Sequence, residues 1–327
     1  MLRDTGMKIV TSSVSEWPEL NAPHVTLGTF DGVHLGHQRL IDELTTWAEK
    51  EGAPSVAITF DRPPRETLDQ ARPEHVTSLR HRLLLLERLG LDVAIVLRFD
   101  AALAKMEAGR FIREIIVRRL NAAGVLLGHD TRFGRGGRGD AALFQRLADE
   151  LGFAVRSVPV VMLDGAPVSS TRVRQAVRTG NLAQARRLLG RPWSTLGTVV
   201  HGTGRGKGFG YPTANLDLHH EVQLPEGVYA TRTGFAGRWH DSVTNIGRAP
   251  SFRRKTPHLS EEVVTECFLL GFDGDLYGRE VEVRFLELLR KERVFDGPEE
   301  LARQIASDVE AAGRVHRTDT NEPEPIV

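Results

Sequence analysis

The chain has 327 residues, long enough for two domains, and its 43 lysines and arginines balance 43 aspartates and glutamates at a net charge of zero. This balance argues against a nucleic-acid-binding protein, which would carry a basic face. The single cysteine, Cys267, excludes an intramolecular disulfide and fits a reducing compartment, and no apolar run approaches the ~18 residues of a membrane span. Residues 1–10 lack a secretion signal, so we expect a cytoplasmic protein that binds neither nucleic acid nor membrane.

The first half of the chain alternates apolar, β-branched runs with segments that carry apolar residues at helical spacing. The runs that predict buried strands are 8–11, 25–27, 54–60, 93–98, 124–128 and 154–161. The segments that predict helices are 40–47, 79–89, 111–120 and 141–151. This alternation predicts βαβ units around a parallel sheet, in which ligands bind at the carboxyl ends of the strands.

The pattern changes near residue 186. Short strand-like runs follow, which favour an all-β barrel, at 196–201, 227–233, 239–246, 263–271 and 279–288. A closing amphipathic helix is expected at 298–312, and the polar, proline-bearing residues 313–327 are expected to be disordered. We therefore predict an α/β domain over 1–186, a barrel domain over 187–312 and a disordered tail.

The first chemical signal is GTFDGVHLGH, which lies between a predicted strand and a predicted helix. Its histidines, His34 and His37, are three residues apart at the helix start and so share one face. Free backbone N–H groups at that point favour an anion. Three glycines let the backbone approach a ligand: Gly28, Gly32 and Gly36. The turn therefore predicts binding of a nucleoside triphosphate.

Two later segments can supply further phosphate contacts. Residues 128–140 (GHDTRFGRGGRGD) combine glycines with Arg132, Arg135 and Arg138, although a solvated basic loop has the same composition. We interpret the GxGxxG inside this loop as accidental, because it does not sit in a tight strand-to-helix turn. Residues 169–174 (SSTRVR) place hydroxyls at a helix start and an arginine one turn later, and an ordinary N-cap is the alternative.

The second domain begins with a glycine-rich segment, GTVVHGTGRGKGFGYPTANL at 197–216. It is not a Walker A loop, because Gly208 follows Lys207 where serine or threonine is needed. Its amides can wrap a phosphate, and Thr213 and Asn215 offer the hard oxygens that Mg²⁺ accepts. Glu266 is predicted mid-strand among apolar neighbours, where a carboxylate is costly unless used or paired. An outward-facing edge-strand glutamate is the alternative.

Together these motifs resemble the bacterial bifunctional riboflavin kinase/FAD synthetase family over residues 8–312. The resemblance implies a Rossmann-like nucleotidyltransferase domain, followed by an all-β riboflavin-kinase barrel with a C-terminal helix. It implies phosphorylation of riboflavin to FMN with ATP and Mg²⁺, then nucleotidyl transfer to FMN that gives FAD and pyrophosphate. The implied partners are riboflavin, FMN and ATP, and a homo-oligomer is compatible with this interpretation.

The resemblance also implies site residues. The expected catalytic residues are His34, His37, Arg174 and Glu266. The expected nucleotide ligands are Gly28, Phe30, Asp31, Gly36, Asp130, Ser170, Thr171, Gly202, Gly206, Lys207 and Gly210. The expected flavin contacts are Asp61, Phe133, Asn245, Arg290 and Glu292, and the expected metal ligands are Thr213 and Asn215.

Two positions depart from the family pattern. Pro63 stands where the usual TFDPHP segment has histidine, and Thr131 stands where phenylalanine is usual. Both are expected to line the ligand pocket, so two alternatives stay open: transfer of another nucleotidyl group, such as cytidylyl, and a riboflavin kinase with an inactive N-terminal half. A non-enzymatic regulator is a third, but no helix-turn-helix or basic tract in the sequence supports it.

Overall fold

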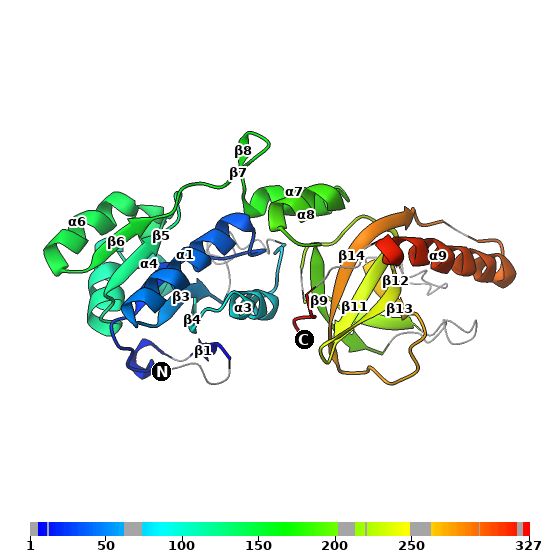
Figure 1. Ribbon diagram of the computed structural model, residues 1–327, viewed down its shortest axis with the longest axis horizontal. Helices are drawn as coiled ribbons and strands as arrows, with labels where there is room; N and C mark the ends of the chain where they lie inside the picture. Colours follow the sequence, from blue (N-terminus) through cyan, green and yellow to red (C-terminus); the bar gives the residue numbers. More distant parts are fainter. Residues whose placement is uncertain are drawn as a thin grey trace. The chain divides into compact units, whose positions relative to one another are not determined.

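The computed structural model describes residues 6–11, 13–61, 74–201, 213–219, 221–248, 263–293, 295–318 and 323–327. Contacts divide the chain into two units (Figure 1). The sheet unit comprises Met1–Glu74 and Leu79–Ser170, and the barrel unit comprises His75–Ser78 and Thr171–Val327. The boundary predicted at residue 186 falls inside α8 (Leu182–Leu189), whereas the division by contacts comes before that helix.

The sheet unit is built on six parallel strands in the order β1–β4–β3–β2–β5–β6. They are β1 (Lys8–Val10), β2 (His24–Leu27), β3 (Ser55–Phe60), β4 (Val93–Leu97), β5 (Gly124–Leu127) and β6 (Ala154–Ser157). The chain adds β3 and β4 on one side of β2, and then β5 and β6 on the other. Such doubly wound sheets bind ligands at the reversal, here between β2 and β5. The predicted α/β class with a parallel sheet is confirmed.

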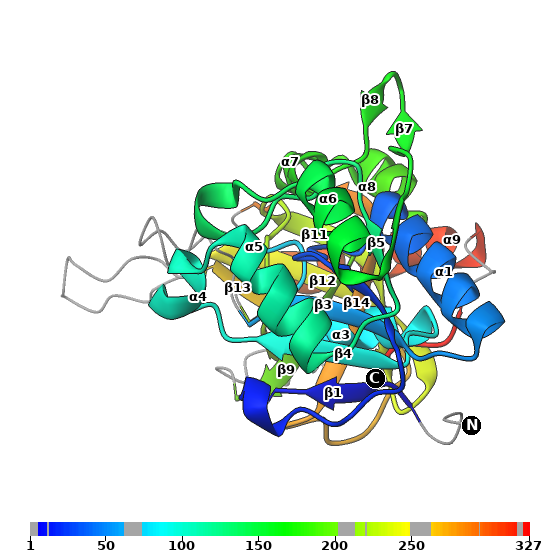
Figure 2. The same ribbon diagram turned by 90° about the vertical axis from the view of Figure 1, so that its left-hand side faces the viewer.

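Helices cover both faces of this sheet because its central strands, β2 to β5, are buried on both sides (Figure 2). They are α1 (Leu35–Glu51), α3 (Leu79–Arg88), α4 (Ala101–Lys105), α5 (Ala108–Phe111), a π-helix (Ile112–Arg119) and α6 (Ala141–Leu151). One face packs on α5, the π-helix and α6 through a core that includes Ile58, Ile95 and Phe144. The buried stripe of α1, which includes Ile41 and Leu44, lies against the other face.

The barrel unit contains a closed, antiparallel, six-stranded barrel in the order β9–β10–β13–β12–β11–β14. Its strands are β9 (Ser194–Val200), β10 (Thr213–Asp217), β11 (Gly227–Phe235), β12 (Arg238–Arg248), β13 (Val263–Leu269) and β14 (Glu280–Arg290). The predicted barrel is confirmed. Strand β10 was not predicted, nor was the short hairpin of β7 (Met162–Leu163) and β8 (Ala166–Pro167) in the sheet unit.

Hydroxyl groups line part of the barrel interior. Thr231 Oγ1 lies 2.8 Å from Ser242 Oγ and 2.8 Å from Thr244 Oγ1. Thr233 Oγ1 lies 2.9 Å from Ser242 Oγ and 3.0 Å from Cys267 Sγ. All five side chains are buried, and burial raises the pKa of the Cys267 thiol. Because the thiolate is the reactive form, Cys267 is an inert core residue.

A four-residue segment from the first half of the chain, His75–Ser78, belongs to the barrel unit. The carboxylate of Glu221, which is 3% exposed, accepts hydrogen bonds from Ser78 N at 2.8 Å and Thr195 Oγ1 at 3.0 Å. Val222 N donates to His75 O at 2.6 Å. A buried glutamate therefore fastens this segment to the barrel, immediately before α3 of the sheet unit begins.

The prediction of a disordered tail at 313–327 is wrong for the residues that the structure describes. The closing helix α9 (Pro298–Thr318) continues six residues beyond its predicted end at 312. Pro323 O accepts hydrogen bonds from Trp239 Nε1 at 2.8 Å and Arg284 Nη1 at 3.4 Å, and Ile326 N donates to Glu282 Oε2 at 3.0 Å. Composition alone missed this, because the stabilising partners are distant in sequence.

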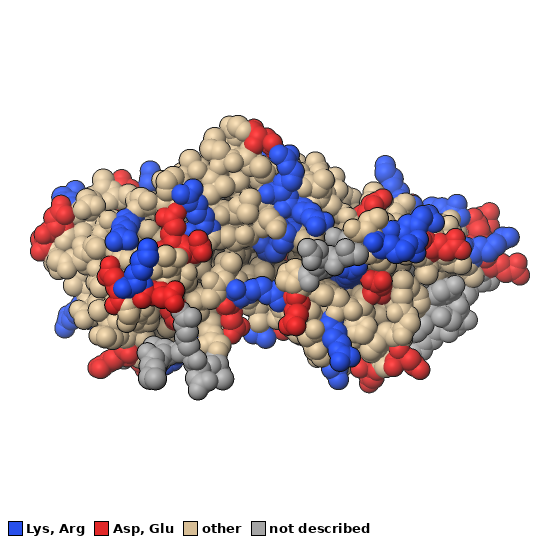
Figure 3. Space-filling view, in the orientation of Figure 1, with Lys and Arg blue, Asp and Glu red and all other residues tan. Residues whose placement is uncertain are grey.

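None of the helices that the structure describes combines the length and the apolar character that a membrane crossing requires. Over the part of the sheet unit seen in Figure 3, positively and negatively charged side chains are interspersed. That distribution is consistent with the zero net charge of the chain.

Candidate active sites

The first site forms where β2 and β5 separate. β2 pairs with β3 over four residues, but it pairs with β5 only at His24 and Val25. The carboxyl ends of β2 and β5 are therefore free to diverge. The turn after β2 contains the non-glycine residues Phe30 (φ 51°) and Val33 (φ 41°), as well as Gly32 (φ 79°). Positive φ is unfavourable for phenylalanine and valine, so the surrounding structure must hold this turn in place.

The turn delivers two histidines to the N-terminus of α1. His34 is the N-cap residue, and its Nδ1 accepts a hydrogen bond from His37 N at 3.4 Å. The two imidazole rings stack with centroids 3.7 Å apart at an interplanar angle of 15°, and Phe30 meets His37 edge-on at 5.3 Å. A Cβ on Gly36 would lie 3.1 Å from His34 Cε1. The absence of a side chain on Gly36 therefore leaves the space that the stacked His34 and His37 rings need.

His37 is held in its neutral form. Burial lowers the pKa of His37 well below 6.5, and the neighbouring His34 and Arg82 side chains lower it further. His37 therefore offers a neutral imidazole at neutral pH, beside the N–H groups of the helix end.

Ser170 is the predicted nucleotide ligand that the structure joins directly to this turn. Its Oγ donates to Asp31 O at 2.8 Å, and Asp31 is 7% exposed. α7 (Ser170–Arg178) begins at this residue. Thr171 and Arg174 belong to the barrel unit by contacts, so their approach to the histidines stays a prediction.

The 128–140 loop serves packing more than the sequence suggested. Phe133, an expected flavin contact, is 7% exposed and packs on Phe144 at 4.6 Å between centroids. A Cβ on Gly134 or Gly139 would meet Ala108 at 2.7 or 2.6 Å, so these glycines permit a close approach of the loop to Ala108. The side chain of Asp130 is 81% exposed. Flavin and nucleotide contacts from this loop stay predictions.

Two other predicted residues of the sheet unit have structural partners. The carboxylate of Asp61, just beyond β3, accepts a hydrogen bond from Phe99 N at 2.9 Å. Gly28 lies beside the ring of Phe30, where a Cβ would come within 3.2 Å of Cζ. Both residues shape the carboxyl edge of the sheet.

The second site is a row of polar residues across three barrel strands. Glu266 on β13 lies opposite Asn215 on β10 and opposite Asn245 on β12. Directly opposed residues in an antiparallel sheet project to the same face. Thr265 and Cys267, the neighbours of Glu266 along the strand, are buried, whereas Glu266 is only half-buried. Because faces alternate along a strand, the row lies on the outer face of the barrel.

The expected metal ligands join this row. Thr213 is two residues from Asn215 on β10 and so shares its face. Hydroxyl, amide and carboxylate oxygens are the ligands that Mg²⁺ accepts, and Mg²⁺ is commonly held by one or two carboxylates together with substrate phosphates. The described residues hold no cluster of three histidine, cysteine or acidic side chains that could bind a metal.

The expected flavin contacts at the end of β14, Arg290, and just after it, Glu292, have structural partners. The guanidinium of Arg290 forms a two-pronged ion pair with Asp308 of α9, with Nη2 at 2.9 Å from Oδ2 and Nε at 3.0 Å from Oδ1. The carboxylate of Glu292 lies against Gly247, where a Cβ would overlap it. Arg290 therefore fastens α9 to the barrel, and its contact with flavin stays a prediction.

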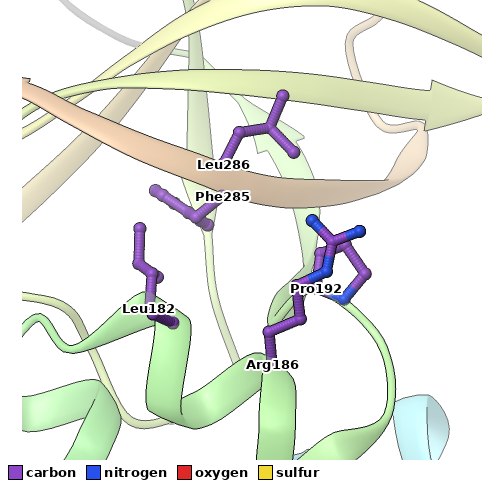
Figure 4. A pocket seen from close by; sticks show the side chains of 6 residues that line it. Leu182, Arg186, Pro192, Phe285 and Leu286 are labelled. Carbon is purple, nitrogen blue, oxygen red and sulfur yellow. The ribbon is translucent and has the colours of Figure 1, made fainter. Parts of the chain in front are cut away.

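Some predicted positions lie outside the described residues, namely Pro63, Gly202, Gly206, Lys207 and Gly210. A small cavity of about 210 Å³ in the barrel unit involves none of the predicted site residues (Figure 4). It is lined by Leu182, Ala183, Arg186, Pro192, Phe285 and Leu286.

Both units are similar in sequence and in fold to known proteins. Residues 18–172 match the FAD synthetase family, and residues 189–316 match the riboflavin kinase family. The bifunctional riboflavin kinase/FMN adenylyltransferase of Escherichia coli is 37% identical over 287 residues, which are 87% of this chain and 90% of the relative. The enzyme of the same name from Haemophilus influenzae is 34% identical over 88% of this chain and 92% of its own length.

The chain belongs to the bifunctional riboflavin kinase/FMN adenylyltransferase family. A crystal structure named as a macrolide-efflux protein from Streptococcus pneumoniae has the same fold, with a TM-score of 0.81 at 30% identity, over 94% of this chain and 99% of that chain. The predicted activities are confirmed: the protein phosphorylates riboflavin and transfers an adenylyl group to FMN, which yields FAD.

One buried cation beside the turn that carries the histidines was not singled out from the sequence. Arg82 of α3 is 4% exposed, and it donates through Nη1 to Thr29 O in the turn that precedes the histidines. The helical pattern of leucines around it indicated a packing helix only. An arginine inside such a stripe is the available signal, because a buried guanidinium needs partners.

Proposed function

We propose that the two reactions of this family divide between the two polar clusters described above. Phosphorylation of riboflavin takes place at the outer row of the barrel, and adenylyl transfer takes place at the turn before α1. The observation that carries the proposal is the register that sets the Glu266 carboxylate between two asparagines. A carboxylate in mid-strand with amide neighbours on the same face is placed for proton transfer rather than for core packing.

In the kinase reaction, Glu266 accepts the proton of the terminal ribityl hydroxyl as that oxygen attacks the γ-phosphorus of ATP. The bond from the γ-phosphorus to the β-phosphate oxygen breaks, and ADP leaves. Asn245 orients the flavin from one side of the carboxylate, while Asn215 and Thr213 would hold Mg²⁺ from the other. When bound, Mg²⁺ supplies positive charge that neutralises the phosphates.

In the transferase reaction, a phosphate oxygen of FMN attacks the α-phosphorus of ATP, and the bond to the β-phosphate oxygen breaks to release pyrophosphate. The attacking group is already an anion, so no protein base is needed, and positioning dominates the rate. His34 and His37 contact the triphosphate at the α1 N-terminus, where the Ser170 hydroxyl holds the turn through its hydrogen bond to Asp31 O. We expect Thr171 and Arg174 of the same motif to hold the departing phosphates.

We expect ATP to be the preferred nucleotide in spite of the changed pocket residues. The Thr131 hydroxyl donates to Gly128 O at 2.9 Å, so it is engaged within its own loop. This engagement leaves little reason for Thr131 to select a different base, while Pro63 lies outside the described residues.

Product analysis by mass tests the proposal. The purified protein is incubated with FMN, Mg²⁺ and an equimolar mixture of ATP, CTP, GTP and UTP, and a parallel reaction contains riboflavin and ATP. We expect FAD as the main dinucleotide and FMN as an intermediate in the second reaction. A different main dinucleotide would assign base selection to the changed pocket, and FMN without any dinucleotide would confine activity to the barrel.

A further inference from the structure

One buried cation near the adenylyltransferase site belongs to no motif. Arg82 lies on α3, is 4% exposed and is surrounded along its helix by the buried leucines Leu83, Leu85 and Leu86. Transfer of a guanidinium from water to such a place is unfavourable unless hydrogen bonds and an opposite charge compensate. The identity of its partners therefore indicates its role.

The partners of Arg82 lie at the carboxyl edge of the sheet. Its Nη1 donates to Thr29 O, just after β2, and lies 3.4 Å from Thr59 Oγ1 in β3. The Thr59 hydroxyl also donates to Thr29 O, at 3.4 Å. Asp31, which is 7% exposed, supplies the opposite charge. One guanidinium thus connects the ends of two strands through the turn that precedes His34.

That turn requires external support. Phe30 and Val33 have positive φ values of 51° and 41°, and each such residue costs on the order of 1–3 kcal/mol unless its surroundings enforce the conformation. The carbonyl that Arg82 binds belongs to Thr29, immediately before Phe30. Ser170 binds the next carbonyl but one, that of Asp31. Side chains from two distant segments therefore clamp the backbone on both sides of Phe30.

We propose that Arg82 is a positioning residue of the adenylyltransferase site, which fixes the backbone of Thr29–Asp31 so that His34 and His37 face the triphosphate. The proposal extends the roles given above to these histidines and rests on them. Two buried polar atoms support it, Arg82 Nε and His37 Nδ1, which have no hydrogen-bond partner among the described residues. Native proteins leave few such atoms unpaired, so their presence fits a site built to receive a polar ligand.

Arg82 also acts on His37 through its charge. The groups that face His37 are the stacked His34 ring, the edge of Phe30 and the Arg82 guanidinium, and burial with both neighbouring charges lowers the pKa of His37. The form that works at neutral pH is therefore neutral. Loss of the Arg82 charge raises this pKa towards 6.5, so His37 takes up a proton at a higher pH and activity falls earlier on acidification.

The test compares Arg82→Met, which removes the charge and the hydrogen bonds, with Arg82→Lys, which keeps the charge. Arg80→Met, an exposed position on the same helix, is the matched control. We expect Arg82→Met to lower kcat/KM of adenylyl transfer about a hundredfold, the usual effect of losing preorganised polar groups. In a plot of kcat/KM against pH, the fall in rate on the acidic side (the acid limb) should move to higher pH for Arg82→Met. For Arg82→Lys, kcat/KM should stay within about tenfold of the unmodified protein and the acid limb should not move. Arg80→Met should match the unmodified protein, and riboflavin phosphorylation should be unchanged in all three.

Several outcomes would overturn the proposal. Equal losses in the Met and Lys variants with an unmoved acid limb would reduce Arg82 to a packing residue. An unchanged kcat/KM of adenylyl transfer in Arg82→Met would show that Arg82 has no positioning role. If the unmodified protein still made FAD in that case, the proposed function would stand and only this inference would fail. If Arg82→Met does not fold, Arg82→Gln replaces it, because glutamine can still donate to Thr29 O without a charge. An unmoved acid limb in a folded Arg82→Gln protein would contradict the electrostatic role.

Discussion

The two active sites proposed for this enzyme are built from different parts of the backbone. The proposed adenylyltransferase site lies in a turn and a helix N-terminus, where Phe30 and His34 are buried, His37 is half-buried and the turn backbone has positive φ values. The kinase site lies mid-strand, where Asn215, Glu266 and Asn245 take their positions from the barrel register. The first site therefore depends on an unusual local conformation, and the second depends on strand pairing that many residues share.

This difference predicts different sensitivities to mutation. In the kinase site a side chain can be exchanged without moving the backbone, because neighbouring strands hold the register. In the adenylyltransferase site even a small change in the turn moves both histidines together. In the kinase site, a mutation should lower activity mainly by removing a reacting group. In the adenylyltransferase site, a mutation should lower activity mainly by displacing the histidines.

Glu266→Gln should produce the largest single loss. Glutamine is nearly isosteric but cannot accept the ribityl proton, so we expect riboflavin phosphorylation to fall about a thousandfold, within the range for a lost general base. Adenylyl transfer from supplied FMN should be unchanged. The matched control is Glu287→Gln, at an exposed position of β14. A folded Glu266→Gln protein that still phosphorylates riboflavin would contradict the assignment of Glu266 as the general base.

His37→Ala should have the next largest effect. It removes a ring that stacks on His34 and meets Phe30, and we expect FAD formation from FMN and ATP to fall about a hundredfold. The phosphorylation of riboflavin by the same protein sample serves as the internal control. If both activities fell together in a folded variant, the picture of two separate sites would be wrong.

Gly36→Ala should give a smaller loss that separates geometry from stability. The new Cβ would lie 3.1 Å from His34 Cε1 and 3.2 Å from its Nδ1, so the ring must shift by a few tenths of an ångström. We expect kcat/KM of adenylyl transfer to fall about tenfold, because reacting groups tolerate little displacement. Stability should hold or rise, since alanine favours a helix by about 1 kcal/mol over glycine.

Gly109→Ala in α5 is the control for that experiment. There a Cβ meets only Arg113 Nη1 at 3.3 Å and Leu147 Cδ1 at 4.0 Å, and the first is the end of a flexible side chain. The two variants share the gain in helix propensity but not the contact with a histidine. Equal rates of FAD formation in both would show that the position of the His34 ring does not limit the reaction.

Much of the fold could be predicted because its strands are short, apolar and β-branched. Ser55–Phe60 and Val93–Leu97 were placed within one residue on this basis, since both are buried on the two faces of the sheet. β10 was missed because TANLD carries three polar residues, Thr213, Asn215 and Asp217, which alternate onto the outer face. The π-helix 112–119 was expected as an ordinary helix, because an apolar pattern does not reveal the hydrogen-bond spacing.

Candidate site residues could be predicted from the sequence where a local motif contains them. His34, His37, Ser170 and Glu266 stand in recognisable local patterns, and the structure adds their partners. Arg82 was not singled out because its hydrogen-bond partners, Thr29 and Thr59, are far from it in sequence. Phe133 shows the converse, because a residue expected at the flavin has a buried ring that packs on Phe144.

The segment fastened by Glu221 limits how modular this enzyme is. The chain passes between the units after Glu74, after Ser78 and after Ser170, so a single cut at residue 186 does not separate two self-contained pieces. A kinase fragment that starts at residue 187 would lack Ser78, and its buried Glu221 carboxylate would lose the 2.8 Å hydrogen bond from Ser78 N. The adenylyltransferase half thus carries a small structural part of the kinase half. A gene fusion that exchanged one half for a relative's would have to exchange this insert as well.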